Sequence, residues 1–335
     1  MKFLLPTGIG DSVWALHKIQ AIRDAQEPGG SIDVHLACGS HNAIESRALD
    51  FVRRFTFVDS AQMFVCGGLG NLPPTRPDGT YNYISDGWYD YDGGRYCVLI
   101  PNATLERGER LESWLPHYPI RWDIFDDFRI LAPERRVADR LASTVGPYAV
   151  FYPGPLLGNT TNGHNRGGLW RPTDWLRLGQ RIRDEFGLHI VVVGAAYDAA
   201  YYDEFLAPML NGLASNWTNL IGGTSLGELW SITSRARFVI SYQAGVGIIS
   251  TYLGTPTGIF WRADGDSISP DMYLTFREAM ASAWVPPSIL SSGSHLPLIY
   301  GRDSVDSVLA EIRTRRWACP ASHVTPAMPV TPSRP

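Results

Sequence analysis

Residues 219–261 read NLIGGTSLGELWSITSRARFVISYQAGVGIISTYLGTPTGIFW, and their pattern is the main guide to the fold class. It holds a helix start with the capping-box pattern Ser225-x-x-Glu228, then an apolar strand, then a turn of small residues that opens another helix. Such a turn gathers free backbone N–H groups at the positive end of a helix, which suits a diphosphate. Glycine is also common at any strand-to-helix junction of a parallel sheet. The turn residues are Gln243, Ala244, Gly245, Val246 and Gly247.

Strands and helices alternate outward from this stretch over the second half of the chain. The pattern predicts strands at residues 148–152, 189–193, 219–221, 238–241 and 257–261, and helices at 173–186, 199–206, from 225 onward and at 246–253. The start of the chain alternates in the same way, with strands at 2–5 and 32–38 and helices from Ser12 onward and at 43–55. Two such series predict an α/β protein with two doubly wound, Rossmann-like domains.

The dipeptide Gly146-Pro147 separates the two series, so we expect domains at residues 1–146 and 147–300. A segment with apolar residues at helical spacing follows at 301–317, and packing back on the first domain is one option for it. The segment 318–335 is rich in proline and has no apolar periodicity, which predicts a disordered tail.

Composition limits the function classes. The 335 residues carry a formal net charge of −4, so the chain as a whole has no general attraction to polyanions. No apolar run approaches the ~20 residues of a membrane-spanning helix, and the first apolar run is too short for a signal peptide. The four cysteines form no C-x-x-C pair, and His164 has no second ligand at zinc-site spacing. We therefore expect a cytoplasmic protein with reduced thiols and no metal.

Residues 59–119 break the alternation with clusters of glycine, proline and aromatic residues. A strand at 96–100 and a helix at 105–114 are the elements predicted there. Aromatic residues in irregular segments are typical of recognition surfaces, and we expect Trp88 and Tyr89 to contact an acceptor.

The donor half resembles a known family in the order and spacing of its motifs. Residues 224–229 (TSLGEL), 236–241 (ARFVIS), 244–245 (AG) and 253–256 (LGTP) are similar to the donor-domain signature of the ADP-heptose:lipopolysaccharide heptosyltransferases, glycosyltransferase family nine. The dipeptide Pro153-Gly154 and the opening Ile9-Gly10-Asp11 resemble the same family. Gln243 departs from it, since the family usually has an acidic residue at this place.

This resemblance implies a GT-B fold, in which two Rossmann-like domains face an interdomain cleft and bind acceptor and donor respectively. It implies an inverting, metal-independent transfer from a nucleoside-diphosphate sugar to a hydroxyl of a glycolipid or polysaccharide, with no cofactor besides this co-substrate. Asp11, which follows Gly10, is implied as the base that takes the acceptor proton. From the residue pattern alone, Asp11 would instead cap the helix that starts at Ser12.

Residues 158–168 (GNTTNGHNRGG) form a polar loop at the carboxyl edge of the second predicted sheet, where ligands bind in such folds. The resemblance implies that residues near this edge bind the donor together with Gly10 and the turn at 243–247. The same composition is equally typical of a flexible surface loop. The implied donor contacts are Gly154, Thr160, Thr161 and Arg166.

Three other functions stay open from the sequence. The aromatic middle segment is compatible with a hydroxymethylated base flipped out of DNA, the acceptor of some bacteriophage glycosyltransferases. A sugar-nucleotide epimerase uses the same architecture, because a fold does not fix a function. A binder of nucleotide sugars without turnover is suggested by Gln243 in place of the acidic residue.

Overall fold

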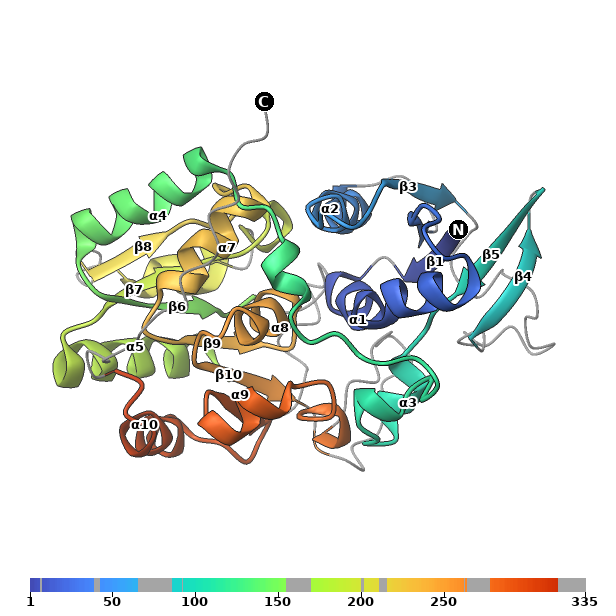
Figure 1. Cartoon of the computed structure of the whole chain (residues 1–335). Helices are drawn as coiled ribbons and strands as arrows, with labels where there is room; N and C mark the ends of the chain where they lie inside the picture. Colours follow the sequence, from blue (N-terminus) through green and yellow to red (C-terminus); the bar gives the residue numbers. More distant parts are fainter. Residues whose placement is uncertain are drawn as a thin grey trace.

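The computed structural model describes residues 1–6, 8–38, 43–65, 86–91, 93–154, 170–199, 202–210, 216–261, 263 and 278–318. In this part of the chain a five-stranded sheet and a six-stranded sheet lie beside each other, each with helices packed against it (Figure 1). No helix among these residues is long and apolar enough to cross a membrane.

The first sheet has the strand order β3-β2-β1-β5-β4. Its neighbours run parallel except for β4 and β5, which form an antiparallel hairpin at one edge. Helices α1 (Ile9–Gln26) and α2 (Ala43–Val52) cover one face, because Phe3, Leu5 and Leu36 share a buried cluster with the apolar side chains of these helices. The strands are β1 (Lys2–Pro6), β2 (Asp33–Cys38), β3 (Ser60–Val65), β4 (Gly87–Tyr91) and β5 (Gly94–Val98).

The second sheet is parallel throughout and has the order β11-β10-β9-β6-β7-β8. The chain order reverses between β6 and β9, and ligands bind at the carboxyl ends of the strands at such a switch point. Its strands are β6 (Tyr148–Tyr152), β7 (His189–Val192), β8 (Trp217–Asn219), β9 (Val239–Tyr242), β10 (Thr257–Trp261) and β11 (His295–Ile299). The α-helices after β5 are α3 (Asn102–Glu106), α4 (Ala132–Val145), α5 (Pro172–Phe186), α7 (Leu226–Arg235), α8 (Gly245–Tyr252), α9 (Pro287–Ser292) and α10 (Val305–Thr314).

Short helical turns connect several of these elements. The 3₁₀ turns are Leu111–Ser113, Ile124–Asp127, Ala196–Asp198, Ala207–Leu210 and Glu278–Met280, and Tyr202–Leu206 is a π-helical turn. The helix predicted at 105–114 was wrong, because α3 ends at Glu106 and Gly108 then adopts a φ of +74° that an α-helix cannot continue. The helix predicted at 199–206 is likewise replaced in its described part by the π-helical turn.

Helix α4 precedes Gly146 in the chain but lies with the second sheet, because it packs along α7 (Figure 1). Arg235 of α7 and Asp139 of α4 form an ion pair across this contact. Glu134 of α4 also pairs with Arg54, which follows α2, at 2.7 Å. Helix α4 therefore packs with the helices of the second sheet. The Arg54–Glu134 ion pair connects it to α2 beside the first sheet.

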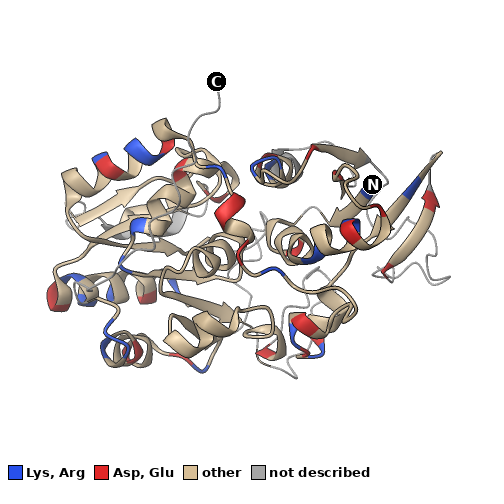
Figure 2. Cartoon of the chain, in the orientation of Figure 1, with Lys and Arg blue, Asp and Glu red and all other residues tan. Residues whose placement is uncertain are grey.

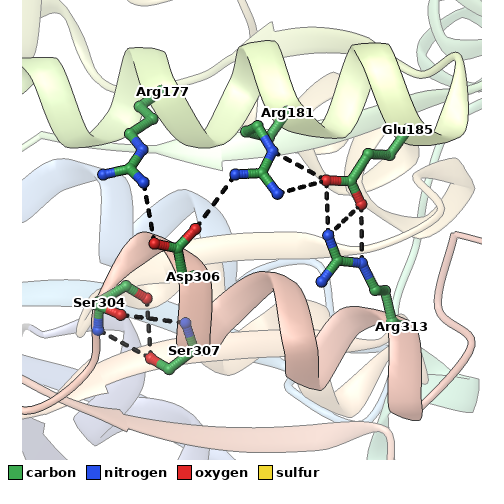
Figure 3. A network of polar contacts seen from close by, with 7 residues as sticks. All are labelled: Arg177, Arg181, Glu185, Ser304, Asp306, Ser307 and Arg313. Carbon is green, nitrogen blue, oxygen red and sulfur yellow. Dashed lines mark hydrogen bonds and ion pairs between the residues drawn. The ribbon is translucent and has the colours of Figure 1, made fainter.

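Helix α10 packs along α5, which differs from the option that it returns to the first domain. Figure 3 shows the polar contacts that join the two helices. Asp306 accepts from Arg177 at 2.9 Å and from Arg181 at 3.2 Å, and Glu185 pairs with Arg313. Apolar residues of α10, among them Val308 and Ile312, complete the contact by joining the buried core. The tail expected at 318–335 lies outside the described residues except for residue 318.

Apolar and aromatic side chains connect the two layers into one buried cluster. The rings of Trp14 in α1 and Trp284 lie 6.2 Å apart, and those of Phe51 in α2 and Trp230 in α7 are also 6.2 Å apart. Basic and acidic positions are interspersed along the helices, and basic residues dominate no described element (Figure 2). The two sheets with their helices are thus packed against each other through apolar side chains.

Candidate active site

Asp11 lies in the first turn of α1, two residues after its first residue, Ile9. The helix is capped by Gly8, so the interpretation of Asp11 as the residue that caps a helix starting at Ser12 was wrong. An acidic side chain in the first turn faces the positive end of the helix, which favours its charged form. Asp11 as a whole residue is of intermediate exposure.

Asn102, the first residue of α3, holds the Asp11 carboxylate. The Asn102 side-chain N–H donates to Asp11 Oδ1 at 2.8 Å. Desolvation raises the pKa of Asp11 from 3.8 to about 6, the Asn102 hydrogen bond opposes this change, and the negative charge of Glu106 adds to it. Asp11 is therefore a carboxylate whose pKa lies close to neutral pH, as a general base requires.

The turn at 243–247 opens α8 as the sequence predicted. Ala244 caps this helix in an extended conformation and contributes no side-chain hydrogen bond. Among the residues described, no carbonyl or side chain accepts from the backbone N–H groups of Gly245, Val246 and Gly247. Gly245 is partly exposed, whereas the other turn residues are buried. The positive end of α8 is thus left open at Gly245.

Gln243, the first residue of this turn, has 7% of its surface exposed. Its Oε1 is buried and has no hydrogen-bond partner in the described part of the chain. Buried amide oxygens are normally paired, so an unpaired one beside an open helix end is a feature to explain.

The first turns of α1 and α8 touch each other (Figure 1). A Cβ built on Gly10 would stand 2.5 Å from Ile248 Cδ1, and one on Gly245 would stand 3.1 Å from Ile9 Cγ2. The carboxylate-bearing turn of α1 therefore lies beside the open N-terminus of α8. We call this contact the α1–α8 junction, formed by residues 8–11 and 243–248.

Gly154, at the carboxyl end of β6, lies against a second buried carboxylate. A Cβ on Gly154 would stand 2.9 Å from Asp198 Oδ1. Asp198 accepts from the Ala195 backbone N–H at 2.7 Å and from the Tyr152 hydroxyl at 3.4 Å. Burial raises the pKa of Asp198 to about 6. The Asp198 carboxylate accepts from the backbone of its own turn, as in a capping box, and this structural role explains why an aspartate is buried there.

Arg47, on α2 beside the first sheet, contacts a residue that follows β7 of the second sheet. Its guanidinium donates to the Tyr197 hydroxyl at 2.9 Å and lies 5.5 Å from the centre of the Tyr197 ring. The positive charge of Arg47 also lowers the pKa of Asp198 in part, against the larger effect of burial. A cation of the first domain thus lies near the carboxyl ends of β6 and β7, and the sequence had not indicated Arg47 as a donor contact.

Trp88 and Tyr89 lie on β4, the edge strand of the first sheet on its side away from the second sheet (Figure 1). Trp88 is 39% exposed, and the Arg95 guanidinium lies 5.0 Å from the centre of its ring. Tyr89 packs against Tyr96 and its buried neighbours on the sheet face opposite α1. The structure does not bring these two residues to the α1–α8 junction.

Thr160, Thr161 and Arg166 lie outside the described residues. Within the described ranges no group of three His, Cys, Asp or Glu side chains is arranged to hold a metal ion. Of the four cysteines, Cys97 on β5 is a buried free thiol whose pKa is raised to about 12 by burial.

No family model and no curated protein matches the chain by sequence. Solved structures do match it, over 94% of its length. The E. coli ADP-heptose lipopolysaccharide heptosyltransferase II is similar with a TM-score of 0.56 and 14% identity over 98% of that chain. A glycosyl transferase family 9 protein from Veillonella parvula DSM 2008 gives a TM-score of 0.57 and 10% identity over 96% of its chain. The E. coli heptosyltransferase WaaC with ADP gives 0.52 and 12% over all of its chain.

The chain has the GT-B fold. This confirms the two parallel-rich sheets and the heptosyltransferase-like architecture that the resemblance implied. Identities of 10–14% show the GT-B fold but assign no residue a role. Only the geometry of Asp11 and of the turn at 243–247 in this chain can therefore support a role for them.

Sequence reasoning missed four residues of the candidate site. Gly8 and Asn102 lie at Asp11, and Arg47 and Asp198 lie near the carboxyl ends of β6 and β7. Asn102 begins α3 four residues after the end of β5, and a polar residue near the carboxyl edge of a sheet is a signal for a ligand site. Asp198 stands three residues after Ala195 in a capping-box position, which points to a turn. No local pattern singles out Arg47, because its partner Tyr197 lies 150 residues away in the chain.

Proposed function

We propose that the protein transfers a sugar from a nucleoside-diphosphate sugar to an acceptor hydroxyl, with inversion and without a metal. The observation that carries this proposal is the α1–α8 junction, where Asp11 and the open N-terminus of α8 meet. The GT-B likeness supports the reaction class, since two of the reported structures are named as heptosyltransferases and one of these was solved with ADP.

Asp11 is the general base in this proposal. Its carboxylate takes the proton of the acceptor hydroxyl while the acceptor oxygen forms a bond to the anomeric carbon. The bond from that carbon to the diphosphate oxygen breaks on the opposite side, and its electron pair leaves with the diphosphate. Attack opposite the leaving group inverts the configuration. Because the pKa of Asp11 is about 6, most of the carboxyl is ionised at neutral pH and can accept the proton.

The leaving diphosphate is bound at the start of α8. The N–H groups of Gly245, Val246 and Gly247 and the positive helix end stabilise its developing charge, as helix N-termini do for phosphates. Arg47 supplies a full positive charge from the first layer. Gln243 offers its unpaired Oε1 to a hydroxyl of the donor. The further donor contacts in this proposal are Gly10, Gly154, Thr160, Thr161 and Arg166.

The acceptor in this proposal is a glycolipid or polysaccharide hydroxyl, bound by the first domain in the cytoplasm. Residues 1–146 and 147–300 remain our proposed acceptor and donor domains, with α4 packed on the donor side. Trp88 and Tyr89 are its proposed contacts at the outer edge, which suits an acceptor that extends beyond the reacting sugar. Nothing at the described residues favours a DNA, epimerase or purely binding function over this one.

Thermal shift with a panel of nucleoside-diphosphate sugars tests the donor, because tight binding raises the melting temperature by mass action. The donor that binds is then incubated with glycolipid and polysaccharide acceptors, and release of nucleoside diphosphate is followed. Transfer to an acceptor supports the proposal. An epimerised free sugar nucleotide, transfer only to DNA, or binding without any turnover would each replace it by the corresponding alternative.

A further inference from the structure

The Asp11 carboxylate is held by one oxygen and left open at the other. Oδ1 accepts from Asn102 at 2.8 Å. Within the part of the chain that is described, no donor reaches Oδ2. A base that must take a proton from a substrate needs this asymmetry, because one oxygen fixes the group and the other receives the proton.

Gly8 makes room for the open oxygen. Asp11 Oδ2 lies over the Gly8 backbone, and a Cβ at this position would stand 2.2 Å from Oδ2 and 3.1 Å from the carboxyl carbon. Any side chain at position 8 would force the carboxylate to rotate. The glycine is not required for backbone conformation, since its φ of −65° and ψ of 132° suit any residue.

Asn102 lies in a position that stability alone does not explain. It is 4% exposed, and its Oδ1 has no hydrogen-bond partner among the residues described. A buried amide with an unpaired oxygen costs stability, so an apolar residue of similar size would suit a purely structural site better. The amide orientation is fixed, because only the NH₂ group can face an ionised carboxylate.

We propose that Asn102 and Gly8 are positioning residues for Asp11. Asn102 holds Oδ1 in place, and Gly8 leaves Oδ2 free to meet the acceptor hydroxyl. This inference rests on the proposed function for its catalytic meaning, while the geometry itself is testable without a substrate.

Among the described residues, few other charges act on this group. Glu106 of α3 is the charged side chain that adds to the pKa of Asp11. Helix α8, the other helix at this turn, contains no acidic or basic residue. Its titratable side chain is Tyr252, at the far end of the helix. On α1 itself the next such groups are His17 and Lys18, about two turns away. Glu106 therefore provides a matched control on the same helix as Asn102.

The test measures the titration of Asp11 directly, by ¹³C NMR of its carboxyl carbon in the full-length protein, with the signal assigned by its loss in Asp11→Asn. We expect Asn102→Leu to raise the midpoint by about one pH unit, because the hydrogen bond to the charged form is lost. Glu106→Gln should lower the midpoint, because a negative charge is removed. Asn102→Ala is the second variant if the leucine variant does not fold, with a smaller rise expected.

A midpoint that does not move in either Asn102 variant would overturn the role of Asn102, whatever the protein catalyses. Gly8→Ala should keep the fold, as judged by circular dichroism, and shift the Asp11 carboxyl resonance. An unchanged resonance would overturn the role of Gly8. In a transfer assay the acidic limb of the pH profile should move with the NMR midpoint. If no variant transfers sugar from any donor to any acceptor while the NMR shifts are present, the proposed function is contradicted. The role of Asn102 and Gly8 in positioning Asp11 would still stand.

Discussion

Gly10 at the start of α1 lies so close to Ile248 of α8 that a Cβ on Gly10 would stand 2.5 Å from Ile248 Cδ1. A side chain larger than hydrogen at position 10 would require the end of the Ile248 side chain to move. This contact places Asp11, one residue further on, beside the N-terminus that we propose holds the diphosphate. We expect this contact to set the distance between the base and the leaving group in the proposed reaction.

Substitutions at this contact should be coupled. Gly10→Ala should destabilise the protein by about 1 kcal/mol, because the new methyl group overpacks against Ile248. Ile248→Val removes the Cδ1 atom in question and should cost about 0.5–1.5 kcal/mol alone. In the double variant the cost of alanine should largely disappear, which denaturant unfolding would measure as a coupling energy. Additive effects would mean that the two residues are not in contact.

Asp11→Asn should lower kcat by about 10²–10⁴-fold, because the base is lost. Donor affinity should change little, since the donor is held by α8 in this account. Steady-state kinetics and thermal shift with the same donor separate the two effects. Asp24→Asn, on the exposed end of the same helix, is the control and should leave both unchanged.

Asp11→Asn should also stabilise the protein at pH 7–8. The folded-state pKa of about 6 lies above the ordinary value of 3.8, so the folded state binds the proton more tightly. Stability from this group is therefore present below pH 3.8 and is lost as the pH rises through 6. Removal of the charge should recover about 1–3 kcal/mol near neutral pH, the lower values reflecting partial exposure. Melting temperatures that differ equally at all pH values would contradict this.

The rate of transfer should fall on the acid side with a midpoint near pH 6, because the protonated carboxyl of Asp11 cannot accept a proton. The profile of kcat/KM against pH between 4.5 and 8 measures this midpoint, with fold checked at each pH. A midpoint near 4 would mean that burial does not act on Asp11 as the structure implies.

Arg47→Met should weaken binding of nucleoside diphosphate by about tenfold, because a charge-assisted contact to phosphate is lost. Calorimetric titration at two salt concentrations measures the change, and the salt dependence should also decrease. Arg140→Met removes an equal charge from the exposed face of α4 and should have no effect. Equal affinities for the Arg47 and Arg140 variants would show that Arg47 serves only to bind Tyr197.

Arg181→Ala should cost about 0.5–1 kcal/mol, since the ion pairs between α5 and α10 are exposed and screened by water. Arg181 donates to both Asp306 and Glu185, as Figure 3 shows, so its removal breaks the network in the middle. Unfolding in low and high salt measures the effect, which should shrink as salt is added. An undiminished effect in high salt would point to lost packing instead.

Local patterns predicted the elements that depend on neighbouring residues. Ser225 and Glu228 form the capping box that their spacing indicated, with hydrogen bonds of 3.2 Å and 2.8 Å. The turn at 243–247 opens α8 for the same reason, since strand, small residues and helix follow each other in the chain. These predictions needed no knowledge of distant contacts.

Features that depend on distant partners were missed. Asn102 and Asp11 are 91 residues apart, so no spacing rule connects them. Strand β11 was not predicted; it contains Pro297, which an edge strand such as β11 tolerates. The 3₁₀ turn Leu111–Ser113 was predicted as part of a longer helix, because the spacing of apolar residues does not reveal the positive φ of Gly108.

A crystal structure of the protein with a bound nucleoside diphosphate, chosen by thermal shift, would show whether the start of α8 binds the phosphates. We predict phosphate oxygens within hydrogen-bond distance of the N–H groups of residues 245–247, on the side of the junction that Asp11 faces. A diphosphate bound elsewhere, with these N–H groups turned to solvent or to protein, would contradict the account.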